Sequence, residues 1–353
     1  MSRRQSPAPS ASRRRRDHLR LAVAALIRNE IDIIGAFLQH LDALFDHVLL
    51  MNHHSIDGTD RVMEAACARH PNWTMWQVEP TGYHQTAFCS VALRHLFTTT
   101  DADFVMFLDA DEFIDVPDRA TLEGAVSILT DPDAVGGLRW RYAVPDRFDE
   151  RPVAPGEPLW RAPEMASLGK SVIPRIFYER HGRVASLGIG NHGLYFNADK
   201  VVPSIRCGEM LHLPIRSHEQ LKSKVLVGAF SVMSIATRNP LLCWHWYDIL
   251  WRIADGMLRD EDLIGIAAHY GEQDRQTSQS MSFADLEAAG YVRSALNVAF
   301  GEPLPSITGP LTVDPARLVA VSLRRFQIEE ETTGTKLMLE GNRLRFIPQE
   351  NQQ

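Results

Sequence analysis

Two acidic residues one position apart, Asp109 and Asp111, follow an uninterrupted apolar run at residues 104–108. Placing both carboxylates in the core of a sheet carries a large desolvation cost, so we expect the pair at the end of a buried strand. Carboxylate oxygens in that place suit Mg²⁺ or Mn²⁺, whose coordination the phosphate oxygens of a substrate would complete. The pair therefore predicts a metal site for a phosphorylated ligand, and the alternative is a solvated turn.

The residues before this pair alternate between strand and helix patterns. Segments of strand length occur at residues 21–27, 47–51, 73–78 and 104–108, and the first and last of them are continuous apolar runs. Apolar residues at helical spacing follow each of the first three segments. Such alternation implies right-handed crossovers, so we predict an α/β fold with a mostly parallel, Rossmann-like sheet and helices on both faces.

The carboxyl ends of the predicted strands meet at one edge of the sheet, where open parallel sheets bind their ligands. This edge holds residues 28–30, 52–59, 79–83 and 109–112. Polar side chains are frequent in three of these segments. The sequence therefore predicts the binding site at this edge.

An Asp-x-Asp pair after an apolar strand serves two chemistries. In haloacid-dehalogenase-like phosphatases the first aspartate, here Asp109, is the nucleophile, and the motif follows the opening strand. In nucleotide-sugar transferases the motif holds a metal ion on the diphosphate and follows a later strand. Here the motif follows the fourth predicted strand and precedes Glu112 rather than a small residue, which favours the transferase.

Four motifs then make a resemblance specific. They are Arg28-Asn29-Glu30, Asn52-His-His-Ser55-Ile-Asp57-Gly58-Thr59, Leu108-Asp109-Ala-Asp111-Glu112-Phe113, and His212-Leu-Pro-Ile-Arg216-Ser217 with Gln220 and Lys224. In this order, over residues 20–235, they resemble family 2 glycosyltransferases, above all the subgroup with an L-D-x-D-E-F motif. The resemblance implies a GT-A fold, a nucleotide-sugar donor, a metal ion and inversion at the anomeric carbon.

The same resemblance implies roles for individual residues. Donor binding falls to Arg28, Asn29, Glu30, Asn52, Ser55, Asp57, Asp109 and Lys170. The metal ligands would be Asp109, Asp111 and His212, with Mn²⁺ or Mg²⁺ as the cofactor. Asp111 and Glu112 are the candidate catalytic residues, with a supporting position behind the site equally open for Glu112, and His192 and Arg216 are placed at the acceptor or behind the site.

Some of these residues have a plain structural alternative. Asp57 and Gly58 can form a simple turn, with Thr59 capping the next helix. His212 can be a satisfied core histidine rather than a metal ligand. Lys170 can neutralise a phosphate or be an ordinary exposed lysine.

The histidines leave further questions open. His192 lies in a glycine-rich turn, where contact with an acceptor and a purely structural role are equally compatible with the sequence. Asn52 stands where the family usually has Asp, which leaves the identity of the nucleotide base open. We expect His53 and His54 to face solvent.

Inversion requires a base for the acceptor hydroxyl, and the sequence leaves Glu112, Asp146 and Glu164 as candidates. The predicted function is metal-dependent transfer of a sugar from a nucleotide sugar to a glycan or lipid-linked acceptor, in the synthesis of a cell-surface polysaccharide. The alternatives are a phosphohydrolase with Asp109 as nucleophile and a non-catalytic glycan-binding relative.

The sequence divides into three predicted segments: a disordered basic tail at 1–18, a GT-A domain at 19–238 and a helical and irregular extension at 239–353. Within them we expect strands at 138–144, 171–173 and 175–178, a loop at 146–163, helices at 219–233, 257–270 and 282–300, and irregular strands at 311–348. Aromatic residues at 244–251 have helical spacing, which is typical of a packing face.

Charge and composition narrow the function classes. The first 20 residues hold seven arginines and one acidic residue, so they carry +6 of a net charge of −7 and leave −13 on the rest. An acidic body excludes a nucleic-acid binder of the usual basic kind. The basic tail is either solvated or in contact with anionic lipid. It is not followed by a secretion-signal pattern.

The apolar runs and the cysteines indicate where in the cell we expect the protein. Charged residues or His interrupt every apolar run before the ~18 residues that a membrane span needs. The four widely spaced cysteines are typical of free thiols in a reducing compartment. We therefore expect a cytoplasmic protein, with the tail as a candidate contact to the inner face of the membrane and with no prediction of oligomeric state.

Overall fold

The computed structural model describes residues 18–182, 185–197, 200–235, 243–271, 280–304 and 335–348. The predictions for the tail at residues 1–17, for the boundary at 238–239 and for strands at 311–334 lie outside the described residues. None of the helices in the described ranges has the length and apolar character of a membrane span.

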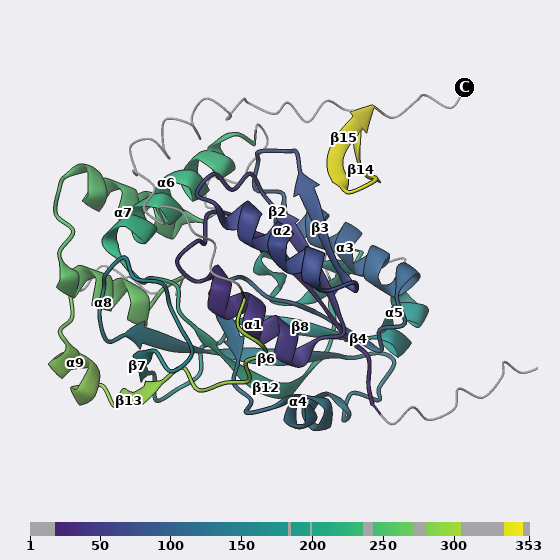
Figure 1. Ribbon diagram of the computed structural model, residues 1–353, viewed down its shortest axis with the longest axis horizontal. Helices are drawn as coiled ribbons and strands as arrows, with labels where there is room; N and C mark the ends of the chain where they lie inside the picture. The colour runs from purple at the N-terminus through teal and green to yellow at the C-terminus, as the bar shows by residue number, and fades with distance from the viewer. Residues whose placement is uncertain are drawn as a thin grey trace, which may run out of the picture.

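The first half of the chain forms the predicted parallel sheet (Figure 1). Its strands are β1 (Leu21–Ile27), β2 (His47–Asn52), β3 (Trp73–Val78) and β4 (Phe104–Phe107), in the order β4-β1-β2-β3. The crossovers contain α1 (Ile34–Leu44), α2 (Thr59–Arg69) and α3 (Gln85–Thr99). All neighbouring pairs in this part are parallel, which confirms the α/β prediction.

Both faces of these strands are covered. Leu21 and Val23 of β1 pack with α1 and α2 on one face, whereas Ala22 and Ala24 pack with α3 on the other. This alternation explains why β1 is a continuous apolar run, because neither of its faces meets water. Polar residues appear only where the strand ends, which places them at the edge of the sheet.

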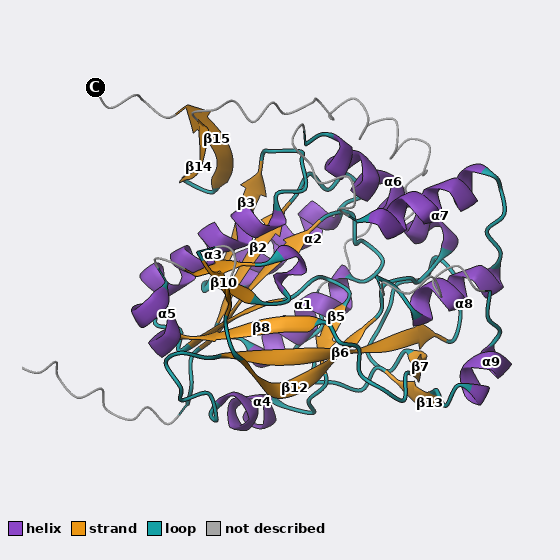
Figure 2. Cartoon of the chain, turned by 180° about the vertical axis from the view of Figure 1, so that it is seen from behind, coloured by secondary structure: helices purple, strands orange, loops and turns teal. Residues whose placement is uncertain are grey.

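The residues after β4 extend the sheet mainly with antiparallel pairs, so that the sheet as a whole is mixed (Figure 2). The added strands are β5 (Glu112–Ile114), β6 (Val135–Pro145), β7 (Pro158–Arg161), β8 (Gly169–Pro174), β12 (Ser204–His212), β13 (Val292–Ala295), β14 (Thr335–Glu340) and β15 (Arg343–Pro348). β8 lies antiparallel between β4 and β6, and β12 lies parallel to β6. A small second sheet contains β9 (Ala185–Leu187), β10 (Leu194–Phe196) and β11 (Lys200–Val201).

The remaining helices cover the end of the sheet where β6 and β7 pair. They are α6 (His218–Met233), α7 (Trp244–Ala254), α8 (Asp260–Ala268) and α9 (Phe283–Ala288), while α4 (Arg119–Val126) lies elsewhere, in contact with α1 and β12. Tyr142 and Val144 of β6 share one buried cluster with residues of α6, α7 and α8. The predicted helix at 219–233 and the helical aromatic segment at 244–251 are thereby confirmed.

Residues 175–178 form the start of a helix, α5 (Arg175–His181), and not the predicted strand. Pro174 lies at its N-cap in an extended conformation. The Arg175 guanidinium donates to three carbonyl oxygens. They belong to Phe97 in the last turn of α3 and to Thr100 and Ala102, which follow that helix. A tertiary contact with the end of a neighbouring helix thus overrides the local strand pattern.

The predicted helix at 282–300 is also wrong in its second half. α9 ends at Ala288, and Gly290 has a φ of +85°, a conformation that interrupts the helix. The next residues form β13, which pairs with β7 inside the segment that we predicted as a loop. Pairing between two short strands that are distant in sequence leaves no local periodicity from which to predict it.

Gly169 fixes how closely β8 approaches β6. A Cβ at Gly169 would lie 1.9 Å from the carbonyl oxygen of Leu138, so any side chain forces these strands apart. We expect Gly169→Ala to lower the free energy of unfolding by about 1–3 kcal/mol, the usual cost of overpacking, measured by urea denaturation. Gly124→Ala in α4 is the control, because nothing lies within 4 Å of a Cβ there. It should be neutral or raise stability by about 0.5–1 kcal/mol. Equal effects of the two changes on stability would contradict the close approach of β8 to β6 at Gly169.

Candidate active site

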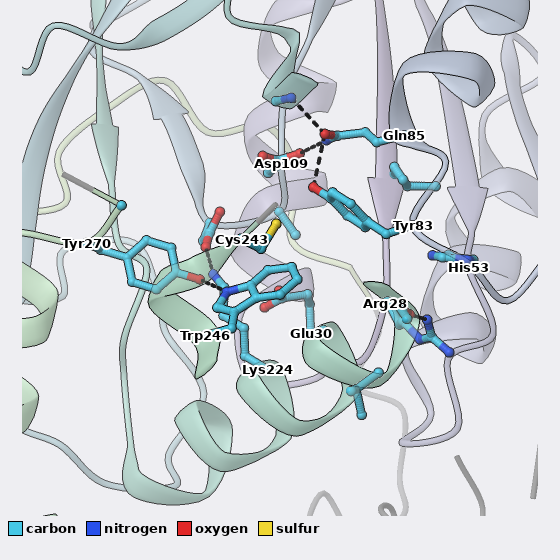
Figure 3. Close-up of a pocket in the computed structure, with 18 of the residues that line it drawn as sticks. Arg28, Glu30, His53, Tyr83, Gln85, Asp109, Lys224, Cys243, Trp246 and Tyr270 are labelled. Atoms are coloured by element: carbon cyan, nitrogen blue, oxygen red, sulfur yellow. Dashed lines mark hydrogen bonds and ion pairs between the residues drawn. The ribbon is translucent and has the colours of Figure 1, made fainter. Parts of the chain in front are cut away.

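A cavity of about 260 Å³ opens at the edge of the sheet where β1 and β4 end (Figure 3). Its walls come from the loop after β1, the turn after β4, the short 3-10 helix at Ile189–Asn191, and helices α6 and α7. Of the predicted site residues, those that line it are Arg28, Asn29, Glu30, Asp109, Asp111, His192 and His212. Residues that the sequence predicted for this edge of the sheet therefore lie around one cavity.

The two aspartates of the turn pair with different lysines. Asp109 Oδ2 lies 2.6 Å from the Nζ of Lys170, and the Asp109 side chain is 34% exposed. Asp111 Oδ2 lies 2.5 Å from the Nζ of Lys224, and the Asp111 side chain is only 3% exposed. Each carboxylate thus has an ammonium group of its own.

Lys170 is enclosed completely. Its side chain has no exposed surface, and its Nζ donates to the carbonyl oxygen of Gly190 at 2.8 Å as well as to Asp109. Burial disfavours the ammonium, yet the carboxylates of Asp109 and Glu112 raise the pKa of Lys170 above its usual value. Lys170 is therefore not an ordinary exposed lysine. It is a buried cation behind the cavity wall.

Glu112 lies in the core behind the turn and does not line the cavity. Its Oε1 accepts from Trp140 Nε1 at 2.6 Å, and its Oε2 accepts from the backbone N–H of Asp109 at 2.9 Å. Burial raises the pKa of Glu112 to about 8, although the nearby Lys170 ammonium lowers it. This geometry corrects the expectation that Glu112 reacts with a substrate, because the carboxyl group holds the turn in place instead.

Asp111 lies among three basic groups. Besides Lys224, its Oδ2 lies 3.7 Å from His212 Nε2 and 3.9 Å from Arg216 Nη1. Burial alone would raise the pKa of Asp111, but the charge of Lys224 and the contact with His212 outweigh burial and hold it well below its usual range. Asp111 is therefore a permanent buried anion.

Arg216 lies behind the cavity and not on its wall. Its guanidinium is 3% exposed and donates to Asp32 Oδ2 at 2.6 Å and to the carboxylate of Glu30. Burial raises the pKa of Glu30 to about 7, although the charges of Arg216 and Lys224 lower it. The sequence placed Arg216 at the acceptor or behind the site, and the structure selects the second position.

The loop after β1 is tied to the loop after β2 by side-chain hydrogen bonds. Asn29 Oδ1 accepts from the backbone N–H of Ile56 at 2.9 Å, and Ser55 Oγ accepts from the backbone N–H of Asn29 at 3.1 Å. Asp57 accepts from the backbone N–H groups of Ile31 and Thr59. These bonds fix Asn29 in a left-handed conformation with a φ of +55°.

Asn52, Ser55 and Asp57 serve this connection and do not line the cavity. Asn52 Oδ1 accepts from the backbone N–H of Ser55, and its Nδ2 donates to Gln77 on β3. The predicted donor-binding residues of these two loops thus divide into two groups. Residues 28–30 face the cavity, and those of the second loop hold the first loop in position.

His53 is buried, with 2% exposure, and the expectation that it faces solvent is wrong. Its Nε2 lies 2.9 Å from the carbonyl oxygen of Pro80, and its ring lines the cavity. Burial lowers the pKa of His53 well below its usual value, so the imidazole is neutral. His54 is half-buried, and its Nε2 contacts the carbonyl oxygen of Glu79.

His192 and His212 contact the same tryptophan. His192 meets the Trp140 ring edge-on at 4.8 Å, and His212 stacks on it at 4.4 Å. His192 Nδ1 lies 2.7 Å from the carbonyl oxygen of Gly169, and burial with the Lys170 charge lowers the pKa of His192 to about 4. Burial also lowers the pKa of His212. Both rings are therefore neutral at pH 7.

The predicted metal ligands do not converge in this arrangement. Within the described ranges, no three His, Cys, Asp or Glu side chains are grouped so that they could hold a metal ion. Asp109 and Asp111 each contact an ammonium group where a divalent cation would compete, and His212 approaches only Asp111. The residues as placed do not fit the predicted set of Asp109, Asp111 and His212.

Trp246, from the aromatic segment that the sequence indicated only as a packing face, also lines the cavity, together with Tyr83 and Tyr270. Trp246 Nε1 donates to the hydroxyl of Tyr270 at 2.7 Å, and Tyr83 meets the Trp246 ring edge-on. Gln85 links Tyr83 with the 3-10 helix, because its Oε1 accepts from the Tyr83 hydroxyl and from the backbone N–H of Gly190 (Figure 3). No local pattern distinguishes Gln85 from other polar residues at the start of a helix, so sequence reasoning had no signal by which to find it.

No protein-family model matches this chain, and no curated protein matches its sequence. Among solved structures, it is similar to S. aureus TarS 1–349, with 15% identity and a TM-score of 0.36 over 61% of this chain and 66% of that one. It is also similar to the mannosyltransferase PcManGT from Pyrobaculum calidifontis in complex with GDP-Man and Mn²⁺, with 17% identity and a TM-score of 0.35 over 77% of this chain and 79% of that one. The same S. aureus fragment in complex with UDP-GlcNAc matches with 14% identity and a TM-score of 0.33, over 60% of this chain and 69% of that one.

The buried carboxyl group of Glu112 generates a pH-dependent prediction. Its pKa is raised from 4.5 to about 8 in the folded protein, so the folded state binds the proton more tightly than the unfolded state. The stabilising effect of that proton is complete below pH 4.5 and is lost as the pH rises through 8. Glu112→Gln keeps a neutral group, so its stability relative to wild type should increase between pH 5 and pH 8.5.

Urea denaturation of both proteins at several pH values measures this difference. Glu164→Gln, a change of an exposed carboxylate that does not line the cavity, is the control. A difference between wild type and Glu112→Gln that stays constant with pH would show that Glu112 is ionised in the fold.

Proposed function

We propose that this chain is a glycosyltransferase that binds a nucleotide sugar in the cavity at the ends of β1 and β4. The observation that carries the proposal is a cavity whose wall combines buried polar atoms lacking a partner, fixed positive groups and aromatic rings. Open α/β sheets bind their ligands at this edge. A nucleotide sugar presents oxygen-rich phosphates, a polar sugar and a flat base, which these three kinds of group complement.

Asn29 and His212, which line the cavity, each have a buried polar atom without a hydrogen-bond partner in the described part of the chain. These atoms are Asn29 Nδ2 and His212 Nδ1. Leaving such an atom unsatisfied costs about 1–3 kcal/mol, so a bound ligand that supplies an acceptor for Asn29 Nδ2 or a donor for His212 Nδ1 would recover this energy. Because Asn29 Oδ1 accepts from a backbone N–H, the Asn29 amide nitrogen is a donor, which suits an oxygen of a ligand.

The charged groups of the wall suit a diphosphate. Arg28 and Lys224 both line the cavity. Arg28, in the loop after β1, donates to Ser231 Oγ on α6, and this hydrogen bond fixes the position of its guanidinium group. Cations held in place before the ligand arrives stabilise the charge that develops on a departing diphosphate.

The proposed reaction is an inverting transfer. The acceptor hydroxyl oxygen forms a bond to the anomeric carbon, the bond from that carbon to the diphosphate breaks, and the hydroxyl proton passes to a carboxylate base. The carboxylates that line the cavity are those of Glu30, Asp109 and Asp111. Neither Asp146 nor Glu164, the other candidates from the sequence, lines it.

The acceptor class, the pathway and the metal requirement extend this proposal beyond the cavity itself. We keep a glycan or lipid-linked acceptor, synthesis of a cell-surface polysaccharide and a cytoplasmic location as predictions from the sequence. Dependence on Mn²⁺ or Mg²⁺ is a prediction from the sequence that the pairing of both aspartates with lysines disfavours. It is tested by comparing turnover in EDTA with turnover in added Mn²⁺, since a required ion must restore activity after chelation.

Release of nucleoside diphosphate from a panel of nucleotide sugars, with and without a hydroxyl acceptor, tests the proposed function. Asp111→Asn should lower kcat/KM by about 100-fold or more, because it removes the anion that holds the basic groups of the wall. Glu164→Gln should retain wild-type activity. A wild-type protein that neither binds nor turns over any member of the panel would overturn the proposal.

The phosphohydrolase alternative is tested in the same preparation. If Asp109 is a nucleophile, beryllium fluoride should form an adduct on its carboxylate, and Asp109→Asn should abolish that adduct. The Lys170 contact at 2.6 Å instead predicts that Asp109 stays paired and gives no adduct.

A further inference from the structure

We propose that Lys224 binds the diphosphate of the donor directly, so that a nucleoside diphosphate binds to this site without a divalent cation. This inference rests on the proposed function and names the group that recognises the phosphates. It starts from the disagreement between the residues in the cavity and the predicted metal site. A lysine ammonium lies at Asp111, where the sequence predicts a metal ion.

Two hydrogen-bond acceptors hold the Lys224 ammonium group at the cavity wall. Its Nζ donates to Asp111 Oδ2 at 2.5 Å and more weakly to the carbonyl oxygen of Pro214 at 3.3 Å. The side chain is 18% exposed and lines the cavity. An ammonium group has three N–H donors, so in the described part of the chain one donor remains for a ligand.

The surroundings of the ammonium favour an anion over water. Its Nζ lies 4.9 Å from the centre of the Tyr270 ring, a cation–π contact that keeps it in place. His212, which has the unsatisfied Nδ1, contacts the same Asp111 and also lines the cavity. Because His212 is neutral and its Nε2 faces Asp111, its Nδ1 is an acceptor, so Lys224 is the group of this pair that can bind an anion.

Lys170 shows what a purely structural lysine looks like in this site. Its side chain has no exposed surface, and it meets Asp109, Glu112 and the Gly190 carbonyl. Lys170 therefore compensates buried carboxylates and has no surface for a ligand. Lys224 has one carboxylate, one weak carbonyl contact and access to the cavity, which distinguishes it as the ligand-binding cation.

The alternative is that Lys224 only neutralises Asp111. A double change separates the two roles, because Asp111→Asn removes the charge that needs neutralising. If Lys224 contacts phosphate itself, Lys224→Met must weaken nucleotide binding in the Asp111→Asn background as well. If Lys224 only serves Asp111, the double variant must bind as tightly as Asp111→Asn.

Isothermal titration calorimetry of the full chain with UDP, GDP, ADP, CDP and TDP, in EDTA and in Mn²⁺, provides the test. We expect wild type to bind at least one of these nucleotides in EDTA. Lys224→Met should weaken that binding about 10- to 100-fold, both alone and in the Asp111→Asn background, because a charge-assisted hydrogen bond is lost. Lys224→Arg should recover part of the affinity.

Lys222→Met is the matched control. Lys222 lies in the same helix, pairs with Glu219 and does not line the cavity, so its removal should leave the affinity unchanged. Because the double variant leaves no unpaired charge at this position, it remains informative if Lys224→Met alone fails to fold.

Two results would overturn the role of Lys224 while leaving the proposed function intact. One is nucleotide binding that requires Mn²⁺ and is unaffected by Lys224→Met. The other is a double variant that binds as tightly as Asp111→Asn. Absence of nucleotide binding to wild type in both EDTA and Mn²⁺ would instead remove the proposed function, and this inference with it.

Discussion

The site depends on the pairing of two acidic residues at the end of β4 with two lysines from distant parts of the chain. A buried carboxylate without a partner would cost several kcal/mol, and the low dielectric that imposes this cost also strengthens the pair once it forms. Lys170 comes from β8 and Lys224 from α6, so the turn after β4 can be accommodated only when both elements have packed. The Asp-x-Asp turn is for this reason a product of the tertiary fold rather than of a local motif.

The loops around this turn are positioned by hydrogen bonds that do not face the cavity. Asn52, Ser55 and Asp57 connect the loop after β1 with the loop after β2, and Glu112 holds the backbone of Asp109. Polar residues at the edge of a parallel sheet thus have two separate tasks. Some line the cavity, and others hold the surrounding loops in position through hydrogen bonds.

Local periodicity in the sequence was enough to predict the parallel half of the fold. The four parallel strands were correct because apolar runs and helical spacing are strong local signals, and residues predicted at their carboxyl ends lie around one cavity. The lysine pairs could not be predicted from ion-pair patterns, since Lys170 lies 61 residues from Asp109 and Lys224 lies 113 residues from Asp111. The same limit explains the errors at α5 and β13 and the burial of His53, where partners distant in sequence decide the outcome.

Residues 243–271 contribute side chains to the cavity wall and do not only support it. Tyr270 lies at the end of α8, and its hydroxyl accepts from Trp246 of α7 while its carbonyl oxygen accepts from the Tyr142 hydroxyl on β6. The same ring lies beside the Lys224 ammonium. Displacing α7 and α8 would therefore expose Lys224 to water and weaken its interaction with any anion, because the attraction between charges falls as the local dielectric constant rises. The aromatic packing of residues 243–271 therefore also maintains the low-dielectric surroundings of the Lys224 charge.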